Sequence, residues 1–262
     1  MRPVSSPKHI PAARSWLGVA SALVGLLVWW LVARTAGLPA FILPSPGGVW
    51  RRLLSSLADG SLLLHTGVTL LEVLLGLFFG VGLATLLGYL VAKSHALERV
   101  LSPYLVASQA VPLVAIAPLL VIWFGPGMFS KVLICALIVL FPVLVNTVVG
   151  VRAVPHALYD LMNSLHATRR QILLKLEIPA ALPIFLGGLR IGATLSVIGA
   201  VVGELVGSDR GLGFLINIGR GQYDTALVFV AVFVLIALAL FLYGAVAWVE
   251  ARALTWQEWR SE

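Results

Sequence analysis

The side chains that could do chemistry are few and scattered along the sequence. The histidines form neither a His-Glu-x-x-His motif nor a Cys/His cluster, so the ligand spacing of a zinc site is absent. No Gly-x-Ser-x-Gly and no Gly-Lys-Ser/Thr sequence occurs, which argues against a nucleophile elbow and a phosphate-binding loop. The histidines are His9, His65, His95, His156 and His166. We therefore expect no catalytic group, no metal and no cofactor, and the chain is not expected to be an enzyme.

The composition is that of an integral membrane protein. Of the 262 residues, 60% are hydrophobic and only 11% are charged, with a mean hydropathy of +1.02. The formal net charge of +7 would suggest nucleic acid in a soluble protein, but basic residues are also enriched in the cytoplasmic loops of membrane proteins. No basic and aromatic patch occurs, so nucleic acid is not an expected partner. The single cysteine, Cys135, lies in an apolar run and excludes an intrachain disulfide.

The apolar runs predict an all-α fold, an integral membrane bundle of six transmembrane helices. The expected spans are residues 15–33, 68–92, 103–124, 132–151, 184–206 and 225–249. They form one membrane domain at residues 15–249, with cytoplasmic tails at 1–14 and 250–262. A cleavable signal peptide is the alternative interpretation of the first run.

Between the spans, two stretches are expected to lie at the membrane surface. Leu43-Pro44-Ser45-Pro46, followed by an amphipathic run through Leu54, predicts a turn and then a helix along the surface. Residues 207–224 are rich in glycine and predict an external loop, with a turn at residues 211–213.

Small residues at four-residue spacing predict close contacts between helices. Gly76 and Gly80 form such a pair in the second span, and two stripes in the fifth span predict tight contacts on two of its faces. The stripes are Gly188, Gly192, Ser196 and Ala200, and Gly199, Gly203 and Gly207. Glu72 either acts within its span or extends to the interface, whereas Glu204 is expected to reach the outer interface.

The loop at residues 152–183 is the longest polar interval between two spans. Leu158, Leu161, Met162 and Leu165 recur at helical spacing after Pro155, which predicts a short amphipathic helix. A second short helix is expected to begin after Thr168, where Gln171 can complete a capping box, and to end near Ile178 before the following proline. Together the two helices would present a docking surface. The alternative is a helix that rests on lipid headgroups.

The distribution of basic residues predicts the orientation. With the N-terminus inside, twelve Lys and Arg residues lie on the inner side and six on the outer side. Both termini and the loop at residues 152–183 are therefore expected in the cytoplasm.

The same loop resembles the "EAA" loop in the permeases of ATP-driven importers. The sequence Ile178-Pro-Ala-Ala-Leu-Pro183 is similar to the apolar-Leu-Pro ending of that loop, and Asp160 falls where the family has its glutamate. Leu161 and Met162 stand in place of the two alanines, and His166 stands in place of a glycine that makes a left-handed corner. Whether His166 keeps that corner is left open by the sequence.

The resemblance extends over about residues 38–249 and implies roles for particular residues. It implies that the first helix of the loop docks on a separate ATPase through the coupling residues Tyr159, Asp160, Leu161, Met162, Ser164, Leu165, His166 and Ala167. The segments at residues 112–125 and 188–216 resemble helices that line the family's translocation path. Candidate path residues are Gln109, Asn146, Ser196 and Glu204.

The resemblance also implies the partners. They are a cytoplasmic ATPase that binds the ATP, an external substrate-binding protein, a second copy of the chain in a homodimer, and membrane lipid. The expected location is the cell inner membrane, where the chain would be a multi-pass importer subunit.

The cargo is predicted only by likeness within the nitrate, sulfonate and taurine group of these permeases. Pro118-Leu119 with Trp123-Phe-Gly125, and Val197-Ile-Gly-Ala-Val-Val-Gly-Glu204, look most similar to permeases for riboflavin or hydroxymethylpyrimidine. Sulfonate, taurine or nitrate is the alternative cargo. An ion-coupled secondary transporter that uses Glu72 and Glu204 is the alternative class.

Overall fold

The computed structural model describes residues 13–110 and 113–255, without the side chains of residues 13–17 and 19 and of several residues between 102 and 110. Helices account for every regular element of this part. The first six are α1 (Ala13–Thr35), α2 (Pro46–Ala58), α3 (Ser61–Lys93), α4 (His95–Ala110), α5 (Leu113–Phe124) and α6 (Met128–Arg152). The others are α7 (His156–Ser164), α8 (Arg169–Ile172), a π-helical turn (Leu173–Glu177), α9 (Ile178–Gly207), α10 (Leu212–Gly221) and α11 (Thr225–Ala253).

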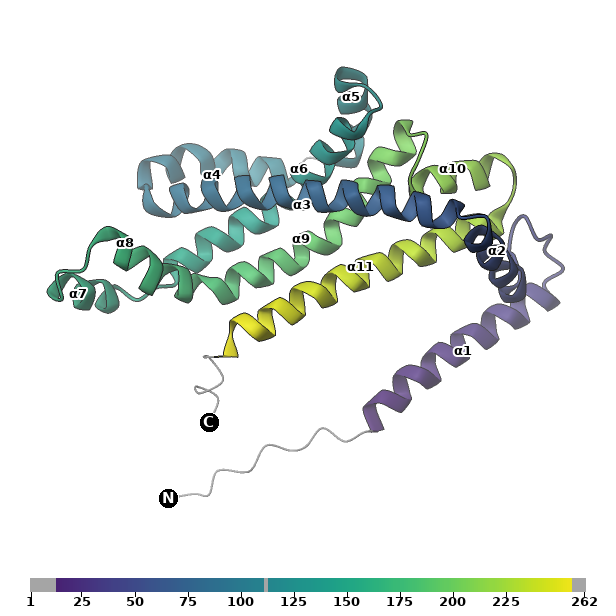
Figure 1. Ribbon diagram of the computed structural model, residues 1–262, viewed down its shortest axis with the longest axis horizontal. Coiled ribbons are helices and arrows are strands. Elements are labelled where there is room, and N and C mark those ends of the chain that lie inside the picture. Colours follow the sequence, from purple (N-terminus) through teal and green to yellow (C-terminus); the bar gives the residue numbers. More distant parts are fainter. Residues whose placement is uncertain (1–12, 111–112, 256–262) are drawn as a thin grey trace.

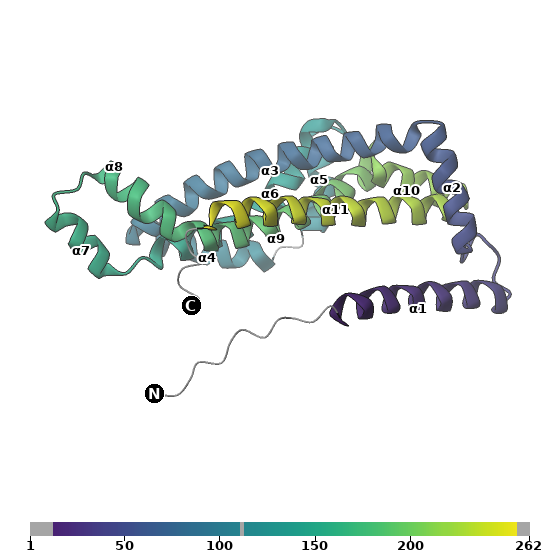
Figure 2. The same ribbon diagram turned by 60° about the horizontal axis from the view of Figure 1, so that its bottom comes forward.

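The long helices α3, α6, α9 and α11 lie alongside one another, and four of the short helices, α2, α7, α8 and α10, lie at the two ends of this bundle (Figure 1). The first end carries α7 and α8, which project beyond the bundle, and the second end carries α2 and α10 (Figures 1 and 2). The beginning of α1 and the end of α11 both point toward the end that carries α7. Helix α4 turns back along α3, and α5 leads from it toward α6.

Four helical segments of the described part are long and apolar enough to cross a membrane. They are Ser61–Lys93, Met128–Arg152, Arg169–Gly207 and Thr225–Ala253. Shorter apolar helices occupy Ala20–Thr35 and Leu113–Phe124. The predicted all-α class is confirmed, whereas the count of six spans stays a prediction.

The predicted third span is not one uninterrupted helix. Its residues divide between α4, which already begins at His95, and α5, while residues 111 and 112 lie outside the described part. The helix that contains the second predicted span begins before it, at Ser61. An uncharged apolar run predicts the part of a helix that can lie in hydrocarbon, not the full length of the helix.

The helix predicted after the proline-rich turn is confirmed as α2, and its place at the membrane surface stays a prediction. The Ser45 hydroxyl accepts a hydrogen bond from the Gly48 N–H at 3.2 Å, and Pro46 stands in the first turn, where its missing N–H costs nothing. The preceding helix α1 is held beside it by Trp29, whose indole N–H donates to the Pro44 carbonyl at 3.1 Å. The same indole stacks on Phe229 of α11, with ring centroids 5.3 Å apart.

Helix α6 lies between α3 and α9 and touches both through glycines. A Cβ added at Gly80 of α3 would stand 2.7 Å from the Ala136 carbonyl oxygen, and one at Gly88 would stand 2.8 Å from Cβ of Thr147. Backbones can approach this closely only where a side chain is missing. The pair predicted at Gly76 and Gly80 therefore makes the α3–α6 contact.

Two faces of α9 are buried as predicted, but the small residues are divided between them differently. Gly188, Gly192, Gly199 and Gly203 each approach residues of α6, and together they make one seam. Ala200, from the first predicted stripe, lies on the other face with Ala193 and Val197 in the core formed with α11. The membership of the stripes differs because four-residue spacing drifts around a helix of 3.6 residues per turn, whereas alternating steps of four and seven residues stay on one face.

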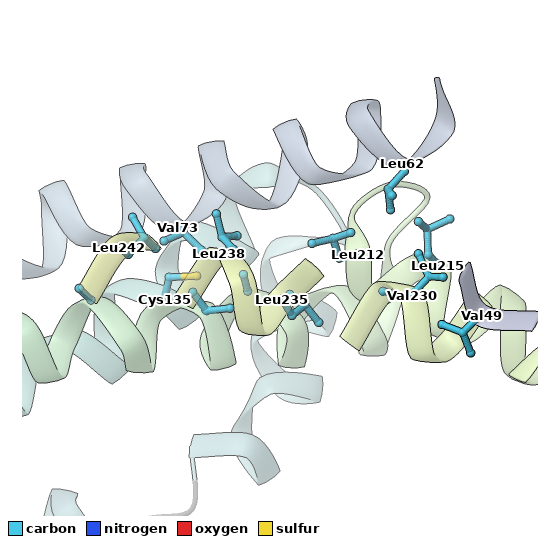
Figure 3. Close-up of a cluster of buried hydrophobic side chains, with 14 residues drawn as sticks. Val49, Leu62, Val73, Cys135, Leu212, Leu215, Val230, Leu235, Leu238 and Leu242 are labelled. Atoms are coloured by element: carbon cyan, nitrogen blue, oxygen red, sulfur yellow. The ribbon is translucent and has the colours of Figure 1, made fainter. Parts of the chain in front are cut away.

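The largest apolar core lies toward the second end, between α3, α9, α10 and α11 (Figure 3). Leu212 and Leu215 of α10 point into it beside Val230 and Leu235 of α11. This burial explains why residues 212–221 form a helix, although their glycines predicted a loop. Tertiary contacts override the weak helix propensity of glycine here.

We predict that two glycines of α3, two positions apart, respond oppositely to alanine. Gly80→Ala should destabilise the folded chain by about 1–3 kcal/mol, since the new methyl group overlaps α6. Gly82→Ala, where nothing lies within 4 Å, should be neutral or stabilising. Thermal unfolding in detergent, followed by size-exclusion chromatography, compares the two, and equal midpoints would contradict the seam.

Candidate functional site

Helix α7 carries an apolar face that the described part of the chain leaves uncovered. It begins after Pro155, whose extended backbone starts the helix, and none of its residues is buried. Leu158, Leu161 and Leu165 are 39%, 54% and 69% exposed, and Met162 on the same face is half-buried. An exposed row of large apolar residues at the tip of a projecting helix is suited to contact with another protein.

The corner after α7 is closed at His166 by a left-handed backbone. His166 has φ +54°, and the N–H of Ala167 donates to the Met162 carbonyl at 2.9 Å while the His166 N–H donates to Asn163 at 2.9 Å. These two bonds are those of a Schellman motif. The left-handed corner that the sequence left open at His166 is thus present in the structure. The Ser164 hydroxyl adds a bond to the Asp160 carbonyl at 2.9 Å.

The second helix of the loop begins as predicted but does not end where predicted. Thr168 and Gln171 form the expected capping box. The helix then continues through the π-helical turn into α9, with Pro179 in its first turn, instead of stopping near Ile178. In the π turn the Ile178 N–H donates to the Leu173 carbonyl, five residues back. This wider turn carries the helix into α9, where the first-turn position tolerates Pro179.

A cluster of polar side chains lies at the base of α7 and was not predicted. Lys93, the last residue of α3, forms an ion pair with Glu177, and its ammonium also donates to the Tyr159 hydroxyl at 3.3 Å. The Tyr89 hydroxyl donates to the second Glu177 oxygen at 3.0 Å. We call these four residues the α7 base cluster. Its members come from α3, α7 and the π turn, and no local sequence pattern joins residues that stand 84 positions apart.

Burial and charge fit together in the α7 base cluster. Glu177 is only 3% exposed, so its carboxylate needs the Lys93 countercharge and the Tyr89 hydrogen bond. Burial also raises the pKa of the Tyr159 phenol, which keeps its proton near neutral pH. The Lys93 ammonium lies 5.0 Å from the centroid of the Tyr159 ring, in cation–π range.

A second ion pair braces the same end of the bundle. Arg152, at the end of α6, binds the Glu98 carboxylate with both guanidinium nitrogens, one of them at 2.8 Å. It also donates to the Val91 carbonyl of α3 at 3.2 Å. Hydrogen bonding to Arg152 lowers the pKa of Glu98 to about 2, so the pair stays charged over the physiological range.

At the second end, Glu204 is turned inward, and the prediction that it reaches the outer interface was wrong. Its side chain is fully buried and accepts hydrogen bonds from the Thr69 hydroxyl at 2.6 Å and the Gly213 N–H at 2.5 Å. The Thr69 oxygen accepts the Leu212 N–H at 2.9 Å. Glu204 and Thr69 therefore each accept one of the free N–H groups at the start of α10, where the negative charge of the carboxylate is also favoured by the helix dipole.

Glu72 neither reaches the interface nor stands alone in its span. It is fully buried beside Glu204, and its carboxylate pairs with the Lys131 ammonium at 3.0 Å. Lys131 donates in turn to the Ser208 hydroxyl at 2.6 Å. Lys131 is one of the six basic residues assigned to the outer side from the sequence, and it is only 4% exposed. Lys131 thus holds one oxygen of Glu72, whereas its other buried oxygen has no hydrogen-bond partner among the described residues.

The remaining candidate path residues are not gathered into one open site. Asn146 of α6 is half-buried against Gly188 and donates to the Pro142 carbonyl at 2.8 Å. Ser196 of α9 is fully buried and donates to the Ala193 carbonyl at 2.7 Å. The backbone of Gln109 lies in α4, but its side chain is outside the described part. Their role in a path stays a prediction.

The architecture is that of a membrane-embedded transport component: apolar helices packed through glycines, buried charges within the bundle, and a projecting helix with an open apolar face. Comparison with known protein families agrees with this class. Residues 63–255 match the family described as binding-protein-dependent transport system inner membrane component. The chain belongs to this family, and it is therefore the permease component of an ATP-driven importer.

Two curated relatives and one solved structure are similar over most of their lengths. The riboflavin transport system permease protein of Chloroflexus aurantiacus is 46% identical, over 92% of this chain and 90% of its own. The formylaminopyrimidine transport permease protein of Halalkalibacterium halodurans is 36% identical, over 90% of this chain and 94% of its own. The inward-facing MetNI methionine transporter matches with a TM-score of 0.62 at 19% identity, over 72% of this chain and 94% of that one, a likeness of fold alone.

We predict that the α7 corner depends on the backbone angle at residue 166. His166→Gly should keep the corner and stabilise it by roughly 1 kcal/mol, whereas His166→Val should open the Schellman bonds, because a β-branched residue disfavours positive φ. Hydrogen exchange of a peptide containing the Ala167 amide reports the difference. Leu165→Val, at an ordinary φ of −82°, is the control for β-branching. A hydrogen-exchange rate in His166→Val equal to that of the unaltered chain would contradict the prediction that the corner depends on φ at residue 166.

Proposed function

We propose that the chain couples ATP hydrolysis to import by docking α7 on a separate cytoplasmic ATPase, which binds the ATP. The observation that carries this proposal is the uncovered apolar face of Leu158, Leu161, Met162 and Leu165 on a helix that projects from the bundle. The Schellman corner at His166 and the capping box at Thr168 hold that face in a fixed shape. Tyr159, Asp160, Ser164 and Ala167 complete the proposed coupling segment.

The proposed orientation places this end of the bundle in the cytoplasm. The described start of α1 and the end of α11 both point toward it (Figure 2), and the excess of Lys and Arg predicted for the inner side supports the same assignment. The chain would then be a multi-pass protein of the cell inner membrane with both termini cytoplasmic. An external substrate-binding protein would deliver cargo at the end that carries α2 and α10.

The subunit is proposed to work as a homodimer, and membrane lipid is proposed to cover the rest of its apolar surface. Exposed apolar side chains along α5, α9 and α11, such as Ile122, Ile198 and Phe241, are available to lipid or to a second copy. Among the path residues whose side chains are described, Asn146 has exposed surface. Ser196 and Glu204 are fully buried, so they would meet cargo only after the helices around them move apart, which for Glu204 means α3 and α10.

For the cargo we propose riboflavin or a related heteroaromatic precursor. The support comes from relatives at 46% and 36% identity that are named for riboflavin and formylaminopyrimidine transport. Sulfonate, taurine or nitrate is the alternative, and it becomes an outcome of the transport test.

We predict that charge on the apolar face of α7 abolishes docking. Leu161→Asp with Met162→Asp should prevent co-purification of the ATPase, because desolvating two carboxylates in an apolar contact is unfavourable. Asn163→Asp adds charge to an exposed neighbouring position of the same helix and is the matched control. An intact complex with the double variant would contradict the docking assignment.

We predict that riboflavin stimulates the reconstituted importer. The purified chain, its co-purified ATPase and the binding protein are placed in lipid vesicles, and ATP hydrolysis is measured with riboflavin, hydroxymethylpyrimidine, taurine and nitrate in turn. Stimulation by riboflavin or the pyrimidine alone is the expected result. Stimulation by taurine or nitrate alone would assign the alternative cargo.

A further inference from the structure

Helix α7 makes few contacts with the long helices of the bundle. In the described part of the chain, α7 packs closely against no other helix, and its one side-chain hydrogen bond to the bundle is that between Tyr159 and Lys93. Other polar contacts of α7, such as Ser164 with Asp160, stay within the loop. Among the polar contacts of the described residues, Tyr159 is therefore the direct side-chain link from α7 to the bundle.

The contact of Tyr159 leads directly to the start of α9. Its hydroxyl meets the Lys93 ammonium, and the same ammonium forms the ion pair with Glu177. Glu177 is the last residue of the π turn, and α9 begins at the next residue. Helix α9 is in turn packed on α6 along the glycine seam.

The π turn is a place where α9 can change its direction. Its hydrogen bonds span five residues instead of four, and such turns are uncommon and frequent at functional sites. Pro179 and Pro183 follow, and neither has an N–H to donate within the helix. The backbone between α7 and α9 is thus a compliant connection, which would absorb a displacement of α7 unless a side-chain contact bypassed it.

We propose that Tyr159, Lys93 and Glu177 form this bypass, and that they are positioning residues which transmit the displacement of docked α7 to α9. The proposal rests on the docking function proposed above for α7. Tyr159 supplies the contact on α7, Lys93 the fixed point on α3, and Glu177 the attachment to α9. Tyr89 holds the second Glu177 oxygen and keeps the carboxylate oriented toward Lys93.

In the α7 base cluster, the contact of Tyr159 with Lys93 can be removed separately from the ion pair between Lys93 and Glu177. Glu177 is 3% exposed whereas the Lys93 side chain is 37% exposed, so the pair is partly shielded from solvent ions. Tyr159 is half-buried and contributes a hydroxyl and a ring face to Lys93, both of which can be removed without leaving a charge unpaired. Tyr159→Leu therefore separates α7 from the cluster while the Lys93–Glu177 pair remains.

The test follows α9 directly and needs no knowledge of the cargo. An environment-sensitive fluorophore is attached at Ile198→Cys, a position of α9 that is 52% exposed, and the native Cys135 is fully buried. The label is read in the complex with the co-purified ATPase while a non-hydrolysable ATP analogue is titrated. Tyr159→Leu, Tyr159→Phe and Glu177→Gln are compared with the unaltered chain. Glu250→Gln, which breaks the α9–α11 ion pair with Arg190 away from α7, is the matched control.

We expect the analogue concentration for half of the label response to rise roughly 5- to 150-fold in Tyr159→Leu, the range of coupling between distant sites. Tyr159→Phe should lie between it and the unaltered chain, and Glu250→Gln should match the unaltered chain. A Tyr159→Leu response equal to that of the unaltered chain, or no response of the label in a stable complex, would overturn the inference. Failure of the unaltered chain to bind any ATPase would instead overturn the proposed function.

Discussion

The close approach of α6 to α3 on one side and to α9 on the other is the contact on which the rest of the structure depends. In hydrocarbon, apolar helices gain little from merely avoiding lipid, so they are held by tight van der Waals packing and by polar bonds. Gly80 and Gly88 of α3, and Gly192 and Gly199 of α9, remove the side chains that would keep the backbones apart. Because α9 is fixed along this seam, the polar groups at both of its ends are also fixed.

Two buried carboxylates bracket α9. Glu177 precedes its first residue and binds Lys93 of α3, and Glu204 near its last turn binds Thr69 of the same helix. The two residues are separated by about 40 Å of helix at 1.5 Å per residue. Each attachment satisfies a buried carboxylate, so removing Lys93 or Thr69 would leave that carboxylate without one of its partners. Helix α9 is thus attached to α3 near both of its ends, and the π turn comes directly before the attachment at Glu177.

Local features were predictable from the sequence, whereas features made by distant residues were not. The capping box at Thr168, the helix after the proline-rich turn at residues 43–46 and the amphipathic α7 depend on neighbours a few positions away, and the sequence predicts each of them. The inward turn of Glu204 depends on Thr69, 135 positions earlier, and no periodicity reports it. Helix α10 was missed because its glycines predict a loop, and only the burial of Leu212 and Leu215 compensates. The stop before Pro179 failed for a related reason: a π turn is a tertiary accommodation, and proline propensity alone gives no sign of it.

The histidine at the α7 corner bears on how loops of this kind are detected in other chains. What the corner requires is a backbone at positive φ, and Asn, Asp and His adopt that angle more readily than other residues with side chains. A search pattern that demands glycine asks for one residue type, although the physical requirement is a dihedral angle that a small set of residues meets. Homologous loops with Asn or His at this position would be overlooked by such a pattern. A pattern written for the angle, with the paired amide-to-carbonyl bonds around it, would retain them.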